Sequence, residues 1–346
     1  MSTTKTILVT RLSAMGDVAM TIPVMKQVLN DNPELEIVFV TNRNWGALCE
    51  GISRLTFFPA DVKGVHKGVK GLYHLFREIK KAHRIHAVAD LHNVLRSQII
   101  RTFFRLSGTP VVAIDKGRAA KKALTRKEHK VLEPVTTTIE RYATVFRELG
   151  FRCEMGREPV FRPRLLPEAV TALTGLKTGK KWVGMAPFAT YREKMYPLGK
   201  MEQILAALVA DPTVQVLLMG GGKEEVAQLS LLAEKYPRAI MLAGRFRLAD
   251  EMAVISQLDV MISMDSANMH LASLFGVPVV SVWGATHPFA GFMGYGQSAD
   301  NAVQIDTLTC RPCSVFGNKP CFRGDHACME WIKPEQISEK VNRILL

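Results

Sequence analysis

The chain has 346 residues, 47% of them hydrophobic, and a formal net charge of +13. That length favours two domains over one, and the sequence holds no run of about 18 uncharged apolar residues that would cross a membrane. The N-terminal residues lack the long apolar stretch of a secretion signal and lead directly into a strand, so we expect a cytoplasmic protein.

The excess positive charge lies in the first half of the sequence. Residues 1–165 hold 28 Lys and Arg against 15 Asp and Glu, whereas residues 166–346 hold 17 against 17. A basic half indicates an anionic partner, either nucleic acid, a membrane surface or an acidic substrate. The alternative is a basic surface with no dedicated partner. Because no basic patch interleaved with aromatic residues and no recognition motif is present, we expect no nucleic-acid partner.

Strands and helices alternate through the first half. The apolar patterns predict strands at 7–10, 37–40, 55–58, 87–89 and 111–114, and helices at 17–29, 44–50, 68–83, 93–106 and 134–149. Such alternation is typical of a doubly wound parallel sheet. Residues 116–130 interrupt the pattern with seven basic residues in fifteen, which predicts a solvated, mobile segment.

A proline-rich stretch at 156–167 is the best linker candidate. A second alternating series follows it, with strands predicted at 182–186, 214–219, 239–242, 259–264 and 279–283, and helices at 199–210, 223–236, 248–257 and 334–346. We therefore predict an α/β protein with an N-terminal domain at 1–160, a second domain at 167–330 and a closing helix at 331–346.

Residues 259–284 form the most informative stretch, because a strand, a short helix and a second strand follow one another. The polar residues Asp265, Ser266 and His270 lie where the helix begins, at the carboxyl end of a strand. Free backbone N–H groups and the positive helix end favour a phosphate there. The alternative is that Ser266 only caps the helix and His270 packs in the core. Gly276 is expected to end the helix in a left-handed conformation.

The first strand-to-helix turn, RLSAMGDV, carries Gly16 and Asp17. A small flexible turn lets another molecule approach the backbone. Asp17 at a helix N-terminus is stabilised as a carboxylate, and a base there could take a proton from a hydroxyl. The alternative is a simple capping residue. The turn lacks both the phosphate-loop and the dinucleotide glycine motifs, which argues against a kinase-type or NAD-type site.

Two further loops of the second half carry candidate ligands. In PFATYREKMYP, Thr190 and Lys194 could face a diphosphate, since cations neutralise a departing phosphate. The alternative is a charged surface loop. The glycine turn at 220–222 precedes Glu224 and Glu225, whose carboxylates could bind ribose hydroxyls. The alternative is a helix first turn enriched in Glu, which the helix dipole alone explains.

Four cysteines fall within nineteen residues, in the pattern C-x2-C-x7-C-x6-C at Cys310, Cys313, Cys321 and Cys328. We call residues 310–328 the cysteine loop. Four thiolates can form a closed tetrahedral zinc site, and His326 could replace one of them. Because the second pair lacks the close spacing of a zinc knuckle, reduced thiols or late-formed disulfides stay open as alternatives.

Taken together, these motifs resemble glycosyltransferase family 9, the ADP-heptose:lipopolysaccharide heptosyltransferases. The resemblance runs along nearly the whole chain. Its most specific parts are RLSAMGDVAMTIPV, DLHNVLRS, KMYP and SMDSANMHLASLFGVPVVSVWGATHP. It implies the GT-B fold, with two Rossmann-like doubly wound parallel-sheet domains facing across a cleft. It also implies inverting transfer of heptose from ADP-heptose to the lipopolysaccharide inner core without a catalytic metal.

The resemblance assigns roles to individual residues. Asp17 matches the proposed general base. The donor-binding residues that it implies are Thr190, Lys194, Glu225, Asp265, Ser266, Ala267 and His270. The sequence departs from the family at Ala267, where glycine is usual, at Tyr196, where tryptophan is common, and at His92–Asn93. Another nucleotide sugar as donor, or a GT-B-like nucleotide-sugar epimerase, therefore stays as an alternative.

A basic first half would then bind an anionic, lipid-linked core oligosaccharide. The candidate acceptor contacts are Arg96, Lys116, Arg118, Lys121 and Lys122. The acceptor lipid would hold the enzyme at the inner face of the inner membrane as a peripheral protein, helped by its positive charge.

Overall fold

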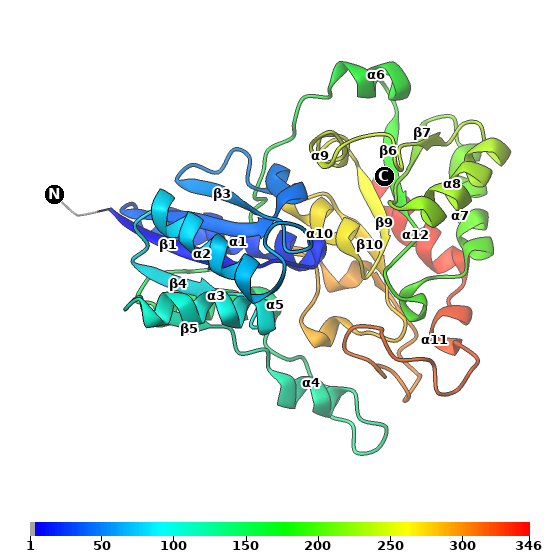
Figure 1. Cartoon of the computed structure of the whole chain (residues 1–346). Coiled ribbons are helices and arrows are strands. Elements are labelled where there is room, and N and C mark those ends of the chain that lie inside the picture. Colours follow the sequence, from blue (N-terminus) through cyan, green and yellow to red (C-terminus); the bar gives the residue numbers. More distant parts are fainter. Residues whose placement is uncertain (1–3) are drawn as a thin grey trace. The chain divides into compact units, whose positions relative to one another are not determined.

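The computed structural model describes residues 4–346, which divide into two compact units. The first unit contains the described residues up to Lys116 together with residues 136–160. The second contains residues 117–135 and 161–346. Each unit is an α/β structure built on one parallel sheet, as the alternation of strands and helices predicts (Figure 1).

The first unit holds a five-stranded parallel sheet in the order β3-β2-β1-β4-β5. The strand order reverses between β1 and β4, and ligands of doubly wound sheets bind at such a point. Its elements are β1 (Lys5–Thr10), α1 (Met15–Asp31), β2 (Leu35–Asn42), the 3-10 helix η1 (Arg43–Leu48), β3 (Leu55–Ala60), α2 (Gly68–Ala82), β4 (Ala87–Asp90), α3 (Leu95–Leu106), β5 (Val111–Ala113) and α5 (Thr138–Glu148).

Helices α2 and α3 pack together over one face of this sheet, in front of it in Figure 1. The buried stripe of α2 includes Leu72, Leu75 and Ile79, which recur at helical spacing. They meet the buried strand residues Leu8 and Val88 in one apolar core. The strands therefore present their carboxyl ends from a rigid base.

The second unit holds a six-stranded parallel sheet in the order β11-β10-β9-β6-β7-β8. Its reversal point lies between β6 and β9. Its elements are α4 (Arg118–Leu124), α6 (Glu168–Thr174), β6 (Lys181–Ala186), η2 (Arg192–Lys194), α7 (Leu198–Ala210), β7 (Val214–Leu218), α8 (Lys223–Lys235), β8 (Ile240–Met241), α9 (Leu248–Ile255), β9 (Val260–Met264), α10 (Ala267–Leu274), β10 (Val279–Val282), η3 (Pro288–Ala290), η4 (Ala299–Asn301), β11 (Ala302–Val303), α11 (Ala327–Glu330) and α12 (Pro334–Leu345).

The closing helix α12 is part of the core of the second unit. Its buried Ile337 and Val341 join a cluster with Ile204 of α7 and Leu229 of α8. A proline stands at its first turn, as predicted. At the end of α10, Gly276 has a φ of 69°, the left-handed conformation that its position predicts. The sequence analysis missed the short elements α6, α11 and β11.

The basic segment, as we call residues 117–135, includes most of the stretch at 116–130 that the sequence predicts to be solvated and mobile, and most of its charged side chains are exposed. It contains helix α4, and Leu124 and Lys121 of that helix are buried. The backbone N–H of Val135 donates to the Phe289 carbonyl at 2.9 Å. The segment thus groups with the second unit, although the sequence boundaries place it in the first domain. Lysine stems cover apolar surface, and a count of charges does not detect this.

The grouping changes the distribution of charge between the units. The first unit holds 20 Lys and Arg against 13 Asp and Glu, and the second holds 25 against 19. The positive excess is therefore shared almost equally, instead of lying wholly in the N-terminal part. A basic surface is a property of both units.

Candidate active site

The second unit gathers the predicted donor residues at one edge of its sheet. Strands β9, β6 and β7 are direct neighbours, and all run parallel. Asp265 follows β9, Lys194 lies in the loop after β6, and Glu225 lies in the helix after β7. Because parallel strands end at the same edge, these side chains share the carboxyl edge of the sheet at its reversal point.

Lys194 and Asp265 form an ion pair. The lysine Nζ lies 3.0 Å from the Oδ2 of Asp265, and the side chains are 14% and 7% exposed. Water screens such a pair weakly, so a change of partner for either charge is energetically significant. A lysine held at this edge can exchange its carboxylate partner for a phosphate oxygen. The sequence analysis names both residues but not their pairing.

Gly317 of the cysteine loop packs against the stem of Lys194. A Cβ atom at Gly317 would lie 2.4 Å from Cγ of Lys194, and the glycine has a φ of +74°. Any larger side chain would displace the lysine and strain the backbone. The cysteine loop thus packs against a residue that is predicted to bind the donor. The sequence analysis missed this contact because no spacing rule links the two positions.

Ser266 begins α10 but does not cap it through its side chain. Its hydroxyl instead lies 3.1 Å from the hydroxyl of Ser263. The first N–H groups of α10 therefore lack a side-chain partner from Ser266 and suit an anion. Ala267 is the first helical residue and is half-buried, whereas His270 is only 7% exposed.

Glu225 is held by the glycine turn that precedes it. The backbone N–H of Gly221 donates to its Oε2 at 2.7 Å. Burial raises the pKa of Glu225, and this N–H group opposes the shift. Glu224, the other candidate, is exposed, and so is Thr190. Of the two glutamates, Glu225 is thus the one with a fixed carboxylate.

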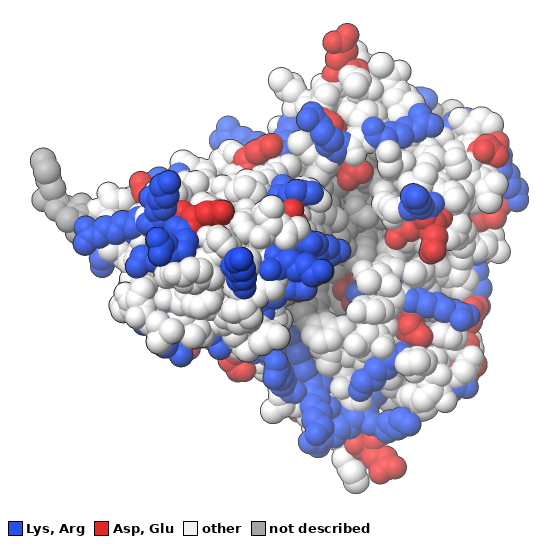
Figure 2. Space-filling view, viewed as in Figure 1, with Lys and Arg blue, Asp and Glu red and all other residues white. Residues whose placement is uncertain are grey.

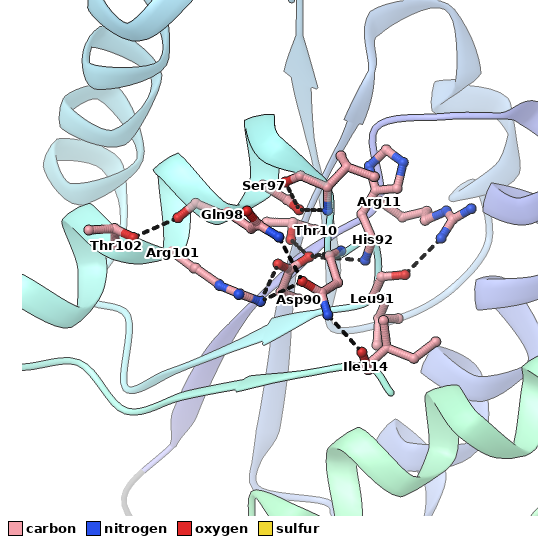
Figure 3. Close-up of polar contacts among 12 residues, drawn as sticks. Thr10, Arg11, Asp90, Leu91, His92, Ser97, Gln98, Arg101, Thr102 and Ile114 are labelled. Carbon is pink, nitrogen blue, oxygen red and sulfur yellow. Dashed lines mark hydrogen bonds and ion pairs between the residues drawn. The ribbon is translucent and has the colours of Figure 1, made fainter. Parts of the chain in front are cut away.

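In the first unit, a buried carboxylate lies at the reversal point (Figure 3). Asp90, at the end of β4, is fully buried. It accepts hydrogen bonds from the Thr10 hydroxyl at 3.3 Å and from the backbone N–H groups of His92 at 3.0 Å and Asn93 at 2.8 Å. Arg101 Nη1 lies 3.1 Å from its second oxygen. With every oxygen engaged, Asp90 fixes the loop after β4 and is no base for a reaction.

Asp17 is the more accessible carboxylate of this edge. Its side chain is 28% exposed, and its Oδ2 lies 2.6 Å from Nη2 of Arg11. Arg11 in turn donates to the Leu91 carbonyl at 2.9 Å and lies 5.9 Å from the ring centroid of Tyr142. Asp17 is the third residue of α1, and its Oδ2 also accepts the backbone N–H of Ala14 at 3.3 Å, so the carboxylate takes part in capping the helix as the alternative predicts. The sequence analysis missed Arg11, although its place after the first strand signals its closeness to Asp17.

His92 is a neutral buried histidine beside Asp17. Burial lowers its pKa to about 3, helped by the positive charges of Arg11, Lys116 and Arg96. Its Nδ1 accepts the backbone N–H of Leu12 at 3.3 Å. The imidazole thus fixes the loop that leads to Asp17. The charge of Asp17, which pairs with Arg11, opposes these three cations in part, and a net positive field at this edge suits an anionic ligand.

The five predicted acceptor contacts divide between the units. Arg96 is exposed at the start of α3, and Lys116 is half-buried in the first unit. Arg118 and Lys122 are exposed on α4 in the second unit. Lys121 is 8% exposed, with its Nζ 4.1 Å from the ring centroid of Phe292. Its ammonium group faces an aromatic ring, so Lys121 differs from the solvent-facing contact that the sequence predicts.

The four cysteines of the cysteine loop are free thiols in this structure. Burial raises the pKa of Cys328 to about 11 and also raises that of Cys313. Within residues 4–346, no group of three His, Cys, Asp or Glu side chains is arranged to hold a metal ion. The neighbouring cysteines of the loop add to these two pKa shifts, so the four thiols interact with one another, and zinc at them stays a prediction.

This architecture and these residues match a known family. The sequence model of glycosyltransferase family 9 (heptosyltransferase) matches residues 73–319. The match covers more than half of the chain. The chain belongs to glycosyltransferase family 9, as the motifs indicate.

Relatives and solved structures agree with this assignment. The chain is 26% identical over 174 residues to lipooligosaccharide heptosyltransferase 2 of Campylobacter jejuni subsp. jejuni serotype O:6, covering 49% of this chain and 53% of that relative. This match thus spans about half the length of the relative.

Two solved structures are similar over nearly their full lengths. A family 9 glycosyltransferase from Veillonella parvula DSM 2008 has a TM-score of 0.77 and 19% identity, covering 100% of this chain and 98% of that one. The ADP-heptose LPS heptosyltransferase II of E. coli has a TM-score of 0.68 and 18% identity, covering 99% and 98%. The predicted GT-B fold, with two doubly wound parallel-sheet domains, is confirmed.

Proposed function

We propose that this chain is an inverting glycosyltransferase that moves a heptose from ADP-heptose to the inner core of lipopolysaccharide. The observation that carries the proposal is the Lys194–Asp265 ion pair at the reversal point of the second sheet. Membership of family 9 supports the activity. The similar E. coli structure is that of an enzyme named for ADP-heptose.

The second unit would hold the donor. Lys194 would leave Asp265 for the diphosphate, and the first N–H groups of α10 would donate to the same phosphate oxygens. Glu225, held by Gly221, would accept hydrogen bonds from ribose hydroxyls. These groups stabilise the negative charge that gathers on ADP as it departs, and this differential binding lowers the barrier.

The first unit would supply the base. An acceptor hydroxyl oxygen attacks the anomeric carbon, the bond from that carbon to the diphosphate oxygen breaks, and Asp17 takes the hydroxyl proton. Attack opposite to the departing ADP inverts the anomeric configuration. Arg11, 2.6 Å from the carboxylate, fixes its direction. General-base catalysis contributes roughly a hundredfold to ten-thousandfold in rate.

The acceptor would be an anionic, lipid-linked core oligosaccharide. Its phosphates and carboxylates match the positive field of Arg11, Lys116 and Arg96 around His92. A lipid-linked acceptor would hold the enzyme at the inner face of the inner membrane. In residues 4–346, no helix is long and apolar enough to cross a membrane. Contact with the bilayer would then be peripheral.

Calorimetry of the purified protein with ADP, UDP, GDP and CMP tests the donor first. We expect selective binding of ADP. A preference for UDP or GDP would be consistent with the same inverting transfer but would mean that the donor is another nucleotide sugar. Binding of none of the four would overturn the proposal.

A transfer assay tests the reaction itself. With ADP-heptose and a core acceptor truncated before its heptoses, we expect ADP release that depends on the acceptor and a product with inverted linkage. Conversion of the donor at an equal rate without acceptor would instead indicate an epimerase or a hydrolase.

A structural zinc ion at the four cysteines stays a prediction from spacing. Metal analysis of protein purified without chelators tests it. A stoichiometric zinc content would require that the four thiols converge on binding, and absence of zinc would remove the prediction. No step of the proposed reaction involves this ion.

A further inference from the structure

Exposed apolar side chains gather on one part of the second unit. The structure shows fifteen exposed large hydrophobic side chains among the described residues, and a third of them lie in or beside the basic segment and the cysteine loop. These five are Val131, Leu132, Phe316, Phe322 and Trp331, which are 44–54% exposed. Three of the five are aromatic. Scattered single exposures need no explanation, but a cluster with this composition indicates a binding surface.

Direct contacts join the basic segment to the cysteine loop. Lys130 Nζ donates to the carbonyl oxygens of Thr309, Cys310 and Pro312 at 2.9, 2.8 and 3.1 Å. Lys127 Nζ lies 4.7 Å from the ring centroid of Phe322. A lysine that satisfies three carbonyls anchors the loop to the segment. The two pieces therefore form one surface within the second unit.

The aromatic residues extend this surface. The guanidinium carbon of Arg323 lies 5.8 Å from the ring centroid of Trp331. The Phe316 ring is 5.6 Å from Phe292, whose other neighbour is Lys121. Each exposed ring thus has a cation over it or over the ring it contacts. We use the name docking surface for the basic segment, which includes Val131 and Leu132, together with the exposed rings of Phe316, Phe322 and Trp331.

The charge of the docking surface is strongly positive. Residues 117–135 contain six Lys and Arg against two Glu. Arg118, Lys122, Arg126 and Lys127 are all exposed. Figure 2 shows Lys and Arg gathered over the part of the surface formed by α4 and the loop after it. Exposed rings beside exposed cations suit a partner that has an apolar interior beneath a negatively charged surface.

We propose that this surface docks the enzyme on an anionic lipid bilayer, with the rings entering the headgroup region and the lysines and arginines binding lipid phosphates. Aromatic side chains favour this interface, and each nearby Lys or Arg strengthens binding to an anionic membrane about fivefold. A second copy of the chain fits poorly, because it would bring like charges together. The proposal deepens the peripheral membrane contact of the proposed function and assigns that contact to the second unit.

Cosedimentation of the full chain with vesicles tests the proposal without donor or acceptor. At about 50 mM salt we expect binding to vesicles with 40% phosphatidylglycerol in phosphatidylcholine, and at least tenfold weaker binding to phosphatidylcholine alone. Raising the salt to about 500 mM should remove most of the binding, since exposed charges are then screened. Equal binding to both vesicle types would overturn the proposal.

Two double variants locate the surface. The first double variant, Arg126→Gln with Lys127→Gln, should weaken vesicle binding at least tenfold at low salt. The second, Phe322→Ser with Trp331→Ser, should weaken vesicle binding about tenfold at both salt concentrations. The control Leu231→Ser removes a side chain in α8 that is 66% exposed and should leave binding unchanged. If the wild type and both double variants bind vesicles with equal affinity, the docking surface is not the part of the protein that binds the membrane.

Unchanged ADP calorimetry and thermal unfolding of the variants would show that they fold. Vesicle binding that persists in a protein without ADP affinity would overturn the donor assignment and leave the docking surface intact, so the two failures are distinguishable. Salt-dependent retention on RNA without vesicle binding would favour nucleic acid instead and overturn the lipid proposal. If the protein forms a concentration-dependent dimer that Phe322→Ser with Trp331→Ser abolishes, the surface binds a second copy of the chain, and the lipid proposal is overturned.

Discussion

The two sheets share the order of their first five strands but present different charged side chains at the carboxyl edge. In each sheet the strand order reverses beside the first strand. The reversal lies between β1 and β4 in the first sheet and between β6 and β9 in the second. The first edge presents Asp17, a partly exposed carboxylate, whereas the second presents Lys194, a cation that is 14% exposed. A doubly wound sheet thus fixes where a ligand binds, and the side chains that follow the strands decide what chemistry occurs there.

The neighbouring carboxylates of the two edges differ as well. Asp90 has four partners and no exposure, so it serves the structure of its loop. Asp265 has Lys194 as its ion-pair partner, so a phosphate can compete for that lysine. Three substitutions test whether Asp17 removes a proton, whether Asp90 is a structural carboxylate and whether Lys194 binds a phosphate.

Asp17→Asn should have the largest effect. If Asp17 removes the acceptor proton, turnover should fall roughly a hundredfold to ten-thousandfold, while ADP affinity stays within twofold. Acceptor-dependent ADP release and calorimetry measure the two quantities. Glu36→Gln, at an exposed carboxylate of the same unit, is the control and should leave both unchanged. Loss of ADP affinity in Asp17→Asn would contradict the base role.

Asp90→Asn tests the structural carboxylate. Asparagine keeps Oδ1 for the two backbone N–H groups but places an NH2 group against the guanidinium of Arg101, so we expect a loss of about 2–4 kcal/mol in the free energy of unfolding. Urea unfolding measures it. The control is Glu154→Gln, which breaks an exposed ion pair with Arg152 and should cost under about 1 kcal/mol. Equal stabilities for the two variants would mean that Asp90 does not organise its edge.

Lys194→Met tests the cation of the second edge. Loss of charge-assisted hydrogen bonds to the diphosphate should weaken ADP binding roughly tenfold to a hundredfold. Lys235→Met removes a lysine that is 64% exposed in the same unit and should leave ADP affinity unchanged. An ADP dissociation constant that Lys194→Met does not alter would rule out the diphosphate contact.

Much of the fold follows from local patterns in the sequence. The ten predicted strands and most of the predicted helices lie within a few residues of their observed places, because apolar runs and caps are local signals. The shared sheet edge of Lys194, Glu225 and Asp265 was also predictable, since each follows a strand. The predicted alternation then places them at one edge.

Contacts between distant parts of the chain were not predictable. The contacts of Lys130 with the cysteine loop and of Gly317 with Lys194 depend on how loops pack, and no periodicity in the sequence records them. The basic segment shows the same limit. Its charges indicate solvent, but the ammonium group of Lys121 lies over the ring of Phe292 and that of Lys130 donates to carbonyl oxygens. A count of charges cannot show which of them face outward.

The smallest effect concerns two buried histidines, one in each unit. Burial lowers the pKa of His92 to about 3 and that of His287 to about 4. Each side chain accepts a backbone N–H through Nδ1, from Leu12 and from Phe289 respectively. Because the unfolded chain binds a proton near pH 6.5 and the folded chain does not, each histidine stabilises the fold fully above that pH. This stabilisation is lost as the pH falls toward the folded value.

We expect each histidine to contribute a slope of up to about 1.4 kcal/mol per pH unit between pH 6 and 5, above the range where most carboxylates titrate. His92→Gln and His287→Gln keep an acceptor for the backbone N–H group but do not titrate. The free energy of unfolding of each variant should therefore fall less steeply than that of the wild type over this interval. Because the two groups are in different units, the double variant should remove both contributions additively. A slope that neither substitution alters would show that these imidazoles are protonated in the folded chain, and would contradict the neutral His92 that fixes the loop of Asp17.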